Sequence, residues 1–152
     1  MPVALHINQT EDYVLRAERE APADKQTVFV LGVMPGWKYR ALQGRIGSRI
    51  PKSSLPVAGP NVPDSPEIAA ARATEHAVLI EAFATLVPDI VQSGLRGWRN
   101  FRDAEGMEVT ISVGMDGAPS LSSLARIDID SLTELAERIM EINQPGAKLL
   151  GN

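Results

Sequence analysis

The apolar residues near the start of the chain recur with the two-residue period of β-strands. Val3, Leu5 and Ile7 occupy every second position, and residues 27–31 form a compact β-branched and aromatic run. Both patterns favour strands. Residues 13–20 can be assigned either to a strand or to a helix. Their apolar side chains alternate as in a strand, whereas their Glu and Arg content favours a helix.

The first part of the chain, residues 1–50, is therefore expected to form a small antiparallel sheet with one helix. The dipeptide Pro35-Gly36 is a turn signal. Residues 37–46 predict a short helix, which Gly44 and Gly47 weaken because glycine has the most backbone freedom to lose in a helix.

A proline-rich segment, residues 51–66, follows. Its prolines leave almost no room for regular backbone hydrogen bonding, so we predict an extended arm. Leu55, Val57 and Val62 make the arm more than a polar spacer. It can lie along its own domain or along a neighbouring subunit, and the sequence leaves both arrangements open.

The clearest helical pattern begins at residue 67. Asp64 or Ser65 can serve as N-cap, and Pro66 suits the first turn. Pro88 would remove a hydrogen bond from a straight helix, so we predict a kink or a restart there. Steps of three and four residues place one set of side chains on a single predicted buried face: Ala69, Ala73, His76, Ile80, Phe83 and Val87.

Two further elements follow. Apolar and polar residues alternate over 107–115, which predicts a half-buried strand ending at the Asp116-Gly117 turn of a β-hairpin. Residues 131–134, Ser-Leu-Thr-Glu, form a capping-box pattern that starts a C-terminal amphipathic helix ending near Asn143. The apolar stripe of this helix consists of Leu132, Leu135, Ala136, Ile139 and Met140.

These elements predict an α+β fold in a single domain, residues 1–152. It comprises a β-rich part (1–50), the proline-rich arm (51–66), and a helical part with short strands (67–152), which holds the long kinked helix, the β-hairpin and the C-terminal helix. At 152 residues the chain is long enough for one hydrophobic core.

Composition and charge narrow the function classes. A net charge of −4 argues against nucleic acid as the default partner. The absence of cysteine excludes disulfides, thiolate metal sites and cysteine nucleophiles. The first residues lack the pattern of a secretory signal, and no uninterrupted apolar run reaches the roughly 18 residues that a membrane span needs. We therefore expect a soluble protein that does not act at a membrane.

Candidate catalytic and metal-binding residues are few. His76 falls on the apolar face of the long helix, where we interpret it as a structural, hydrogen-bonded residue. Asp128 and Asp130 could converge on a divalent cation, but acidic residues before a helix also suit its positive end, and we prefer that role. Asp103 and Glu105 fit a solvated turn. We assign no catalytic, cofactor or metal residue and expect a protein that is not an enzyme.

Residues 95–106 concentrate aromatic and basic side chains, including Trp98 and Phe101. Arg96, Arg99 and Arg102 recur every three residues, which in a helical turn would line one side. The stretch can serve as structural core, as a protein interface, or as a single-strand nucleic-acid site. For protein binding the candidate residues are Trp98, Arg99 and Phe101, the similar Gly-Trp segment at Trp37, and Leu55 and Val57 of the arm.

The pattern Gly-Trp-x-Asn-Phe-x-Asp-x-x-Gly, residues 97–106, resembles the Trp-centred segment of tail assembly chaperones and related small morphogenesis proteins of long-tailed bacteriophages. In these proteins a helix runs into Gly-Trp, an Asp-x-x-Gly turn, an apolar strand and a Leu-rich helix. Residues 87–95, 109–113 and 132–143 match the flanking parts. The resemblance covers residues 76–152. The proline-rich arm and the Gly36-Trp37 segment have no counterpart in it.

The resemblance implies a non-enzymatic bacteriophage morphogenesis protein that binds other proteins, most like a tail assembly chaperone. Its partners would be the tail tube or tape-measure protein, and it would work in the host cytoplasm during phage assembly. The alternative is a structural virion component, such as a capsid decoration, neck or tail protein, that clasps neighbouring capsid or neck subunits. Association into a homo-oligomer stays open, and single-strand nucleic-acid binding is a third hypothesis.

Overall fold

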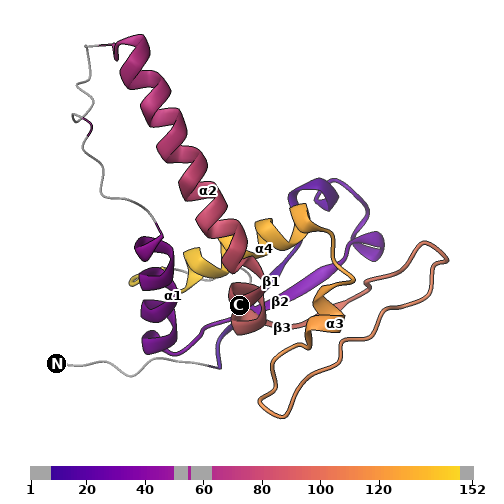
Figure 1. Ribbon diagram of the computed structural model, residues 1–152. Helices are drawn as coiled ribbons and strands as arrows, with labels where there is room; N and C mark the ends of the chain where they lie inside the picture. The colour runs from indigo at the N-terminus through magenta and orange to yellow at the C-terminus, as the bar shows by residue number, and fades with distance from the viewer. Residues whose placement is uncertain (1–7, 50–54, 56–62, 148–152) are drawn as a thin grey trace. The chain divides into compact units, whose positions relative to one another are not determined.

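The computed structural model describes residues 8–49, 55 and 63–147 (Figure 1). One antiparallel sheet and separate helices form an α+β fold, as the sequence predicts. The chain falls into two compact units, Met1–Tyr39 with Val87–Asn152, and Arg40–Leu86. The described elements are β1 (Thr10–Tyr13), the 3-10 turns Arg16–Glu18 and Ala23–Lys25, β2 (Val28–Gly32), α1 (Gly36–Ser48), α2 (Pro66–Gly94), β3 (Leu95–Arg99), α3 (Leu121–Leu124) and α4 (Ile129–Ile142).

The sheet has the order β1-β2-β3, with both neighbours antiparallel to the central strand β2. The predicted strand at 27–31 and the predicted helix after Pro35 are confirmed by β2 and α1. The ambiguous segment 13–20 divides into the end of β1 and a 3-10 turn. The predicted strand at 3–7 lies outside the described residues. The third strand comes instead from β3, far along the chain.

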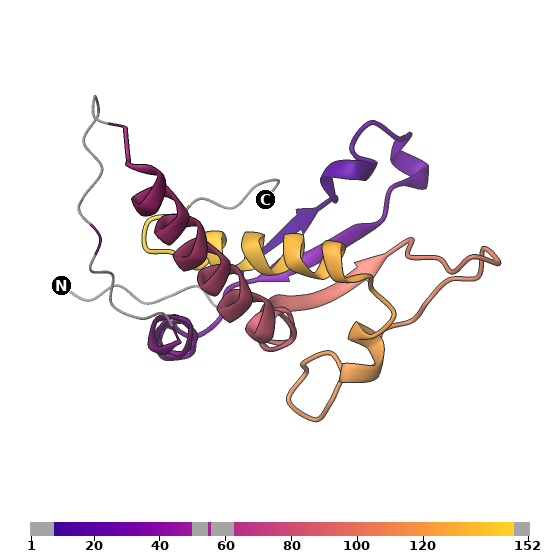
Figure 2. The same ribbon diagram turned by 45° about the horizontal axis from the view of Figure 1, so that its top comes forward.

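One face of the sheet is buried beneath α4, which runs along the strands (Figure 2). Tyr13 and Trp98 are both paired with Phe29 in register, so their side chains share this face. The predicted amphipathic C-terminal helix is confirmed, and its buried residues are Leu132, Leu135, Ala136, Ile139 and Ile142. With Phe29, Leu31, Ile90, Val91 and Leu95 they form the core of this unit.

The start of α4 differs from the predicted capping box. The N-cap is Asp128, whose carboxylate accepts hydrogen bonds from the backbone N–H and the hydroxyl of Ser131. These bonds lower the pKa of Asp128. Ser131 therefore lies inside the helix and is not its N-cap, and the capping-box prediction was wrong. Asp128 has the helix-end role that we preferred over cation binding.

A buried ion pair joins β1 to α4. Glu11 is completely buried, and Arg138 donates to both of its carboxylate oxygens, over 2.8 and 2.6 Å. Arg138 also donates to Glu141 at 2.8 Å. The hydrogen bonds to Glu11 raise the pKa of Arg138 and outweigh the effect of burial. A bidentate ion pair of this kind fixes the position of α4 along β1.

A close helix-helix contact completes the packing. Gly94, the last residue of α2, lies so near Ile139 that a Cβ atom at position 94 would collide with the isoleucine side chain. One turn further along α4, the Asn143 side chain accepts a hydrogen bond of 2.7 Å from the backbone N–H of Met34, just after β2. The C-terminal end of α4 is thus held to both α2 and the segment after β2.

Helix α2 corrects part of two predictions. It continues through Pro88, so the predicted restart is wrong, while the alternative of a kink stays a prediction. Pro88 is exposed, so the hydrogen bond that proline cannot donate is lost on the solvent side. His76 and Ile80, predicted to be buried, are exposed. The predicted face is buried at Val87 but not from Ala69 to Ile80, because this helix is apolar on more than one side and the buried Ala82 and Leu86 lie on another.

The predicted strand at 107–115 is also wrong. The described backbone there makes only isolated bridges, Arg102 with Glu108 and Val113 with Pro119, within two short loops. The side chains of Asp103 and Asp116 accept hydrogen bonds from nearby backbone N–H groups. Such local bonds compete with a strand ladder.

Glu11→Ala tests the buried ion pair. Removing Glu11 leaves the mostly buried Arg138 with Glu141 as an ion-pair partner, so we expect the free energy of unfolding to fall by about 3 kcal/mol in urea denaturation. The matched control is Asp12→Ala, which breaks the exposed pair of Asp12 and Arg99 and should cost less than about 1 kcal/mol. Equal losses in the two variants would contradict this account.

Candidate protein-binding surface

Trp98 lies at the junction between the sheet and the two loops that follow it. Its ring packs edge-on against Phe29, with centroids 6.4 Å apart, and against Phe101, at 5.3 Å. Its ring N–H donates to the carbonyl of Val109 over 2.6 Å. Trp98 is half-buried. It therefore anchors the first loop, residues 101–109, to the sheet.

Asn100 turns the chain out of β3. Its φ of 56° is in the left-handed region, which asparagine tolerates better than most residues. Its side-chain amide donates to the carbonyls of Asp24 and Gln26, and its side-chain oxygen accepts from Arg102. These bonds direct the chain from β3 into the first loop.

Backbone hydrogen bonds close both loops. In the first loop Val109 N–H donates to the carbonyl of Phe101 over 2.7 Å. In the second loop, residues 112–120, Ser120 N–H donates to the carbonyl of Ser112 over 2.8 Å. The second loop is also attached to its surroundings, because Gln92 of α2 donates to the Pro119 carbonyl.

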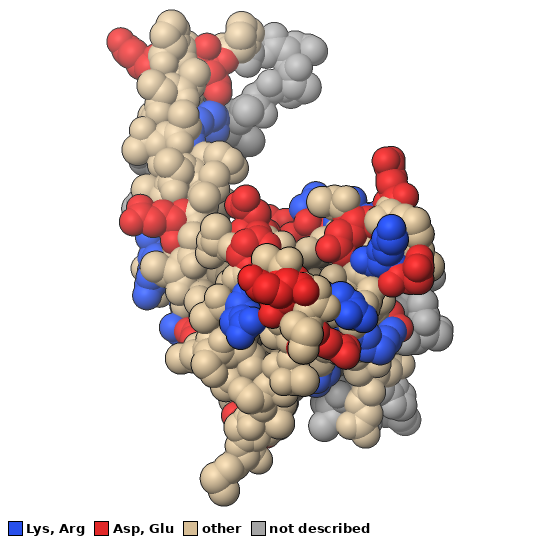
Figure 3. Space-filling model, turned by 90° about the vertical axis from the view of Figure 1, so that its right-hand side faces the viewer, with Lys and Arg blue, Asp and Glu red and all other residues tan. Residues whose placement is uncertain are grey.

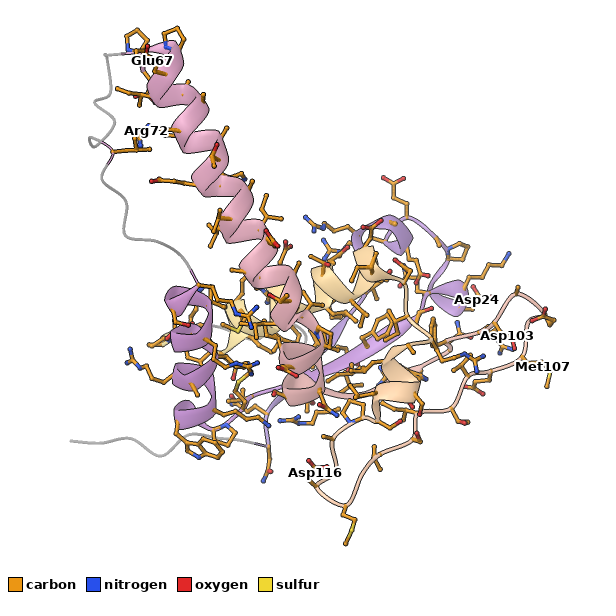
Figure 4. All side chains as sticks on the ribbon, viewed as in Figure 1. Asp24, Glu67, Arg72, Asp103, Met107 and Asp116 are labelled. Carbon is orange, nitrogen blue, oxygen red and sulfur yellow. The ribbon has the colours of Figure 1, made fainter. Side chains whose placement is uncertain are left out.

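The loops hold large apolar side chains in solvent. Met107 is 68% exposed, Val113 is 55% exposed and Met115 is fully exposed. Figure 4 shows Met107 at the far end of the first loop and Asp116 on the second. Leu121 and Ile129, which follow the loops in the chain, are exposed as well. Exposed apolar side chains mark a protein-binding site where they gather into one patch, and the two loops are the candidate for such a patch in this structure.

Carboxylates lie on both loops, mostly on the first. The loops carry one basic residue, Arg102, and four acidic ones, Asp103, Glu105, Glu108 and Asp116. Arg102 is bonded within the first loop, to Asn100 and to the carbonyl of Gly106. The tips therefore combine apolar contact area with negative charge.

The three arginines of residues 95–106 do not form the predicted row. Arg96 and Arg99 lie in strand β3, whose register is irregular opposite Val30 and Leu31, and Arg102 lies beyond the strand, so no helical turn aligns the three. Arg96 donates to the carbonyls of Ser93 and Val33, and burial lowers its pKa. Arg99 pairs with Asp12 at 2.6 Å. The helical arrangement that the nucleic-acid hypothesis used was therefore wrong.

The other candidate residues are scattered. Among those predicted to bind protein, Trp98 and Phe101 are in contact, whereas Arg99 lies on the opposite face of the sheet. Trp37 is 74% exposed in the first turn of α1. Leu55 is half-buried in a bend. Val57 lies outside the described residues.

A shallow hollow of about 280 Å³ lies between the 3-10 turn after β1 and α4. Burial, with the hydrogen bond to Glu134, raises the pKa of Tyr13 to about 12. Burial alone would raise the pKa of Glu134, but hydrogen bonds from the Arg16 N–H and the Tyr13 hydroxyl, and the Arg16 charge, lower it. The lining residues are Tyr13, Arg16, Arg19, Glu134, Glu137, Arg138 and Glu141.

The charges around this hollow are paired with one another. Arg16 contacts Glu134 and Glu137, and Arg138 bridges Glu11 and Glu141. On the side of the molecule seen in Figure 3, acidic and basic side chains are intermixed, whereas the lowest projection is almost entirely uncharged. The paired groups hold β1 against α4, so we assign the hollow to stability.

Neither metal-ligating side chains nor likeness to a known protein points to a site among the described residues. Within the ranges that the structure describes, no group of three or more His, Asp or Glu side chains could hold a metal ion. The chain matches no known family model, and comparison with curated proteins and solved structures finds nothing similar to it.

Trp98→Phe tests the anchoring of the first loop. The variant keeps an aromatic ring but loses the bond to the Val109 carbonyl, so we expect a loss of about 1 kcal/mol in unfolding free energy. Amide hydrogen exchange at Val109 should become faster, whereas the amides of α4 should remain among the most slowly exchanging of the chain. Unaltered protection at Val109 would show that Trp98 does not hold this loop.

Glu134→Gln tests the pairing of β1 with α4. Because the native pKa of Glu134 is below its ordinary value of 4.5, its carboxylate stabilises the fold above that pH, and this contribution is lost as the pH falls through the native pKa. The variant should be less stable than the parent at pH 7 by about 1 kcal/mol, and the difference should narrow in acid. The control Glu137→Gln removes only an exposed contact with Arg16 and should cost less at pH 7 than Glu134→Gln does. A Glu134→Gln deficit that stays constant with pH would contradict the pairing.

Proposed function

We propose that this chain is a non-enzymatic bacteriophage morphogenesis protein that acts by binding other proteins, most like a tail assembly chaperone. The observation that carries the proposal is the pair of closed loops with Met107 and Met115 at their exposed ends. A soluble protein gains nothing in stability from holding such side chains in water. Contact with a partner would bury these side chains and so contribute to binding.

Methionine suits a surface that must accept a client with an irregular apolar surface. Its unbranched, polarisable side chain adapts to different shapes, so it is common on surfaces that bind several sequences. The carboxylates beside it keep the loops soluble and favour a client whose apolar surface is bordered by basic residues. A tail component before assembly, with its subunit contacts still uncovered, is a client of this kind.

The proposal gives different roles to residues of the Trp-centred segment. Trp98 and Phe101 anchor the loops to the sheet, and Asp103 to Gly106 form the turn within the first loop. The residues that contact the partner are then the apolar side chains at the tips. Trp98→Ala would weaken binding indirectly, because the first loop would lose its anchor.

Substitution of the loop tips tests the proposal. The double variant Met107→Ser and Met115→Ser leaves the loop-closing hydrogen bonds in place, so we expect the parent fold by circular dichroism. Its affinity for the tail tube or tape-measure protein of the same phage should fall at least about tenfold in calorimetry, since two apolar anchors are lost. The control is Gln144→Ser, an exposed change after α4. Unchanged affinity of the folded double variant would overturn the loop-tip interface.

A second measurement distinguishes an assembly factor from a virion component. Mass spectrometry of purified particles should detect no stoichiometric amount of this chain if it acts as a chaperone. A stoichiometric amount would instead support the structural alternative, in which the chain stays attached to its neighbours.

A further inference from the structure

One face of α2 is apolar and exposed within the unit Arg40–Leu86. Ile80 is 56% exposed, and Phe83 is half-buried beside it. The face carries no Asp, Glu, Lys or Arg side chain. Its exposed members are Ala69, Ala70, Ala73, His76, Ala77, Ile80 and Ala84.

The spacing along this face is that of a helix packed against another helix. Its central positions are separated by alternating steps of four and three residues from Ala69 to Phe83. This 3.5-residue repeat keeps a seam in line with a partner helix. The side of α2 that the chain itself buries is a different one, marked by Ala82 and Leu86.

A membrane fits the same helix less well. α2 is long and apolar enough to cross a bilayer by length and composition. Its last part, however, is core, since Val87, Ile90 and Val91 are fully buried. The remaining part carries Glu67, Arg72, Glu75 and Glu81, which a span would place in hydrocarbon.

We infer that this face of α2 pairs with the same face of a second copy of the chain, with the two helices antiparallel. The size of the side chains selects this arrangement. Small residues lie toward the start of the seam and large ones toward its end, so antiparallel pairing sets Ala73 of one copy against Phe83 of the other. It likewise sets His76 against Ile80. Large side chains then fill the space beside small ones, as a packed core requires.

Parallel pairing would place each residue of the face against the same residue of the other copy, and it would leave gaps between the alanines at one end. A partner with charged groups on its contacting face would have to bury them without counter-charges. The second copy offers an uncharged face of the same length. The inference goes beyond the proposed function, and its test uses no phage partner.

Sedimentation equilibrium of the full chain, at pH 8 and over a wide concentration range, tests the pairing. We expect a reversible dimer, and Ile80→Glu should weaken it at least about tenfold, because each copy would bury a carboxylate in an apolar seam. Thr74→Glu, an exposed change on the flank of the same helix, is the matched control and should change the dimerisation constant by less than about twofold. A chain that is monomeric throughout, or equal loss in both variants, would overturn the inference.

Disulfide crosslinking tests the direction, and the chain has no native cysteine to interfere. Antiparallel pairing brings Ala70 of one copy beside Ala84 of the other. The double variant Ala70→Cys and Ala84→Cys should therefore form a covalent dimer on mild oxidation, whereas Ala73→Cys alone should not. Crosslinking of Ala73→Cys to itself would show parallel pairing and overturn the inference. So would binding of the parent chain to neutral phosphatidylcholine vesicles with loss of the dimer.

Discussion

The contact of Trp98 with Phe29 on one side and the Val109 carbonyl on the other connects the fold to its surface. Phe29 is on the central strand and is buried beneath α4, so packing against it fixes the position of the Trp98 ring. The hydrogen bond from the ring N–H to the Val109 carbonyl then holds the first loop, which has little regular structure, in a fixed place. The loop can then hold an apolar tip in solvent without collapsing onto the core.

The fixed position of the sheet depends in turn on charge. Glu11 is buried on the face that α4 covers, and Arg138 satisfies its two oxygens. A buried carboxylate is tolerated only with such a partner, so any slip of α4 along β1 would leave it unpaired. The ion pair thereby selects one position for the helix, while the apolar residues around it supply the area. Gly94 lets α2 reach the same helix closely enough to close the core.

Elements with a strong local pattern could be predicted from the sequence, and those set by tertiary pairing could not. β2 carries a compact β-branched and aromatic run, α4 carries clear helical periodicity, and both lie where these patterns place them. β3 was not foreseen, because Leu-Arg-Gly-Trp-Arg has neither alternation nor β-branched residues, and it is a strand through its pairing with β2. In 107–115 the alternation was real, but the backbone there bonds mostly within its own two loops instead of to a strand of the sheet. For α2, periodicity showed that a helix exists, yet a helix with several apolar sides does not reveal which side its own chain buries. The Trp-centred segment was recognised as a junction, whereas the methionines of the loops were assigned to a strand.

The central claim is that the two loops are ordered before any partner binds. Backbone ¹⁵N relaxation of the free protein measures this directly, through the order parameters of residues 101–120. The account predicts values near those of α4, roughly 0.8 or higher, across both loops, with the methionine methyl groups broadened by a soluble paramagnetic agent. Order parameters below about 0.6 throughout the loops would contradict it. Trp98 would then not hold the loop tips in a fixed position.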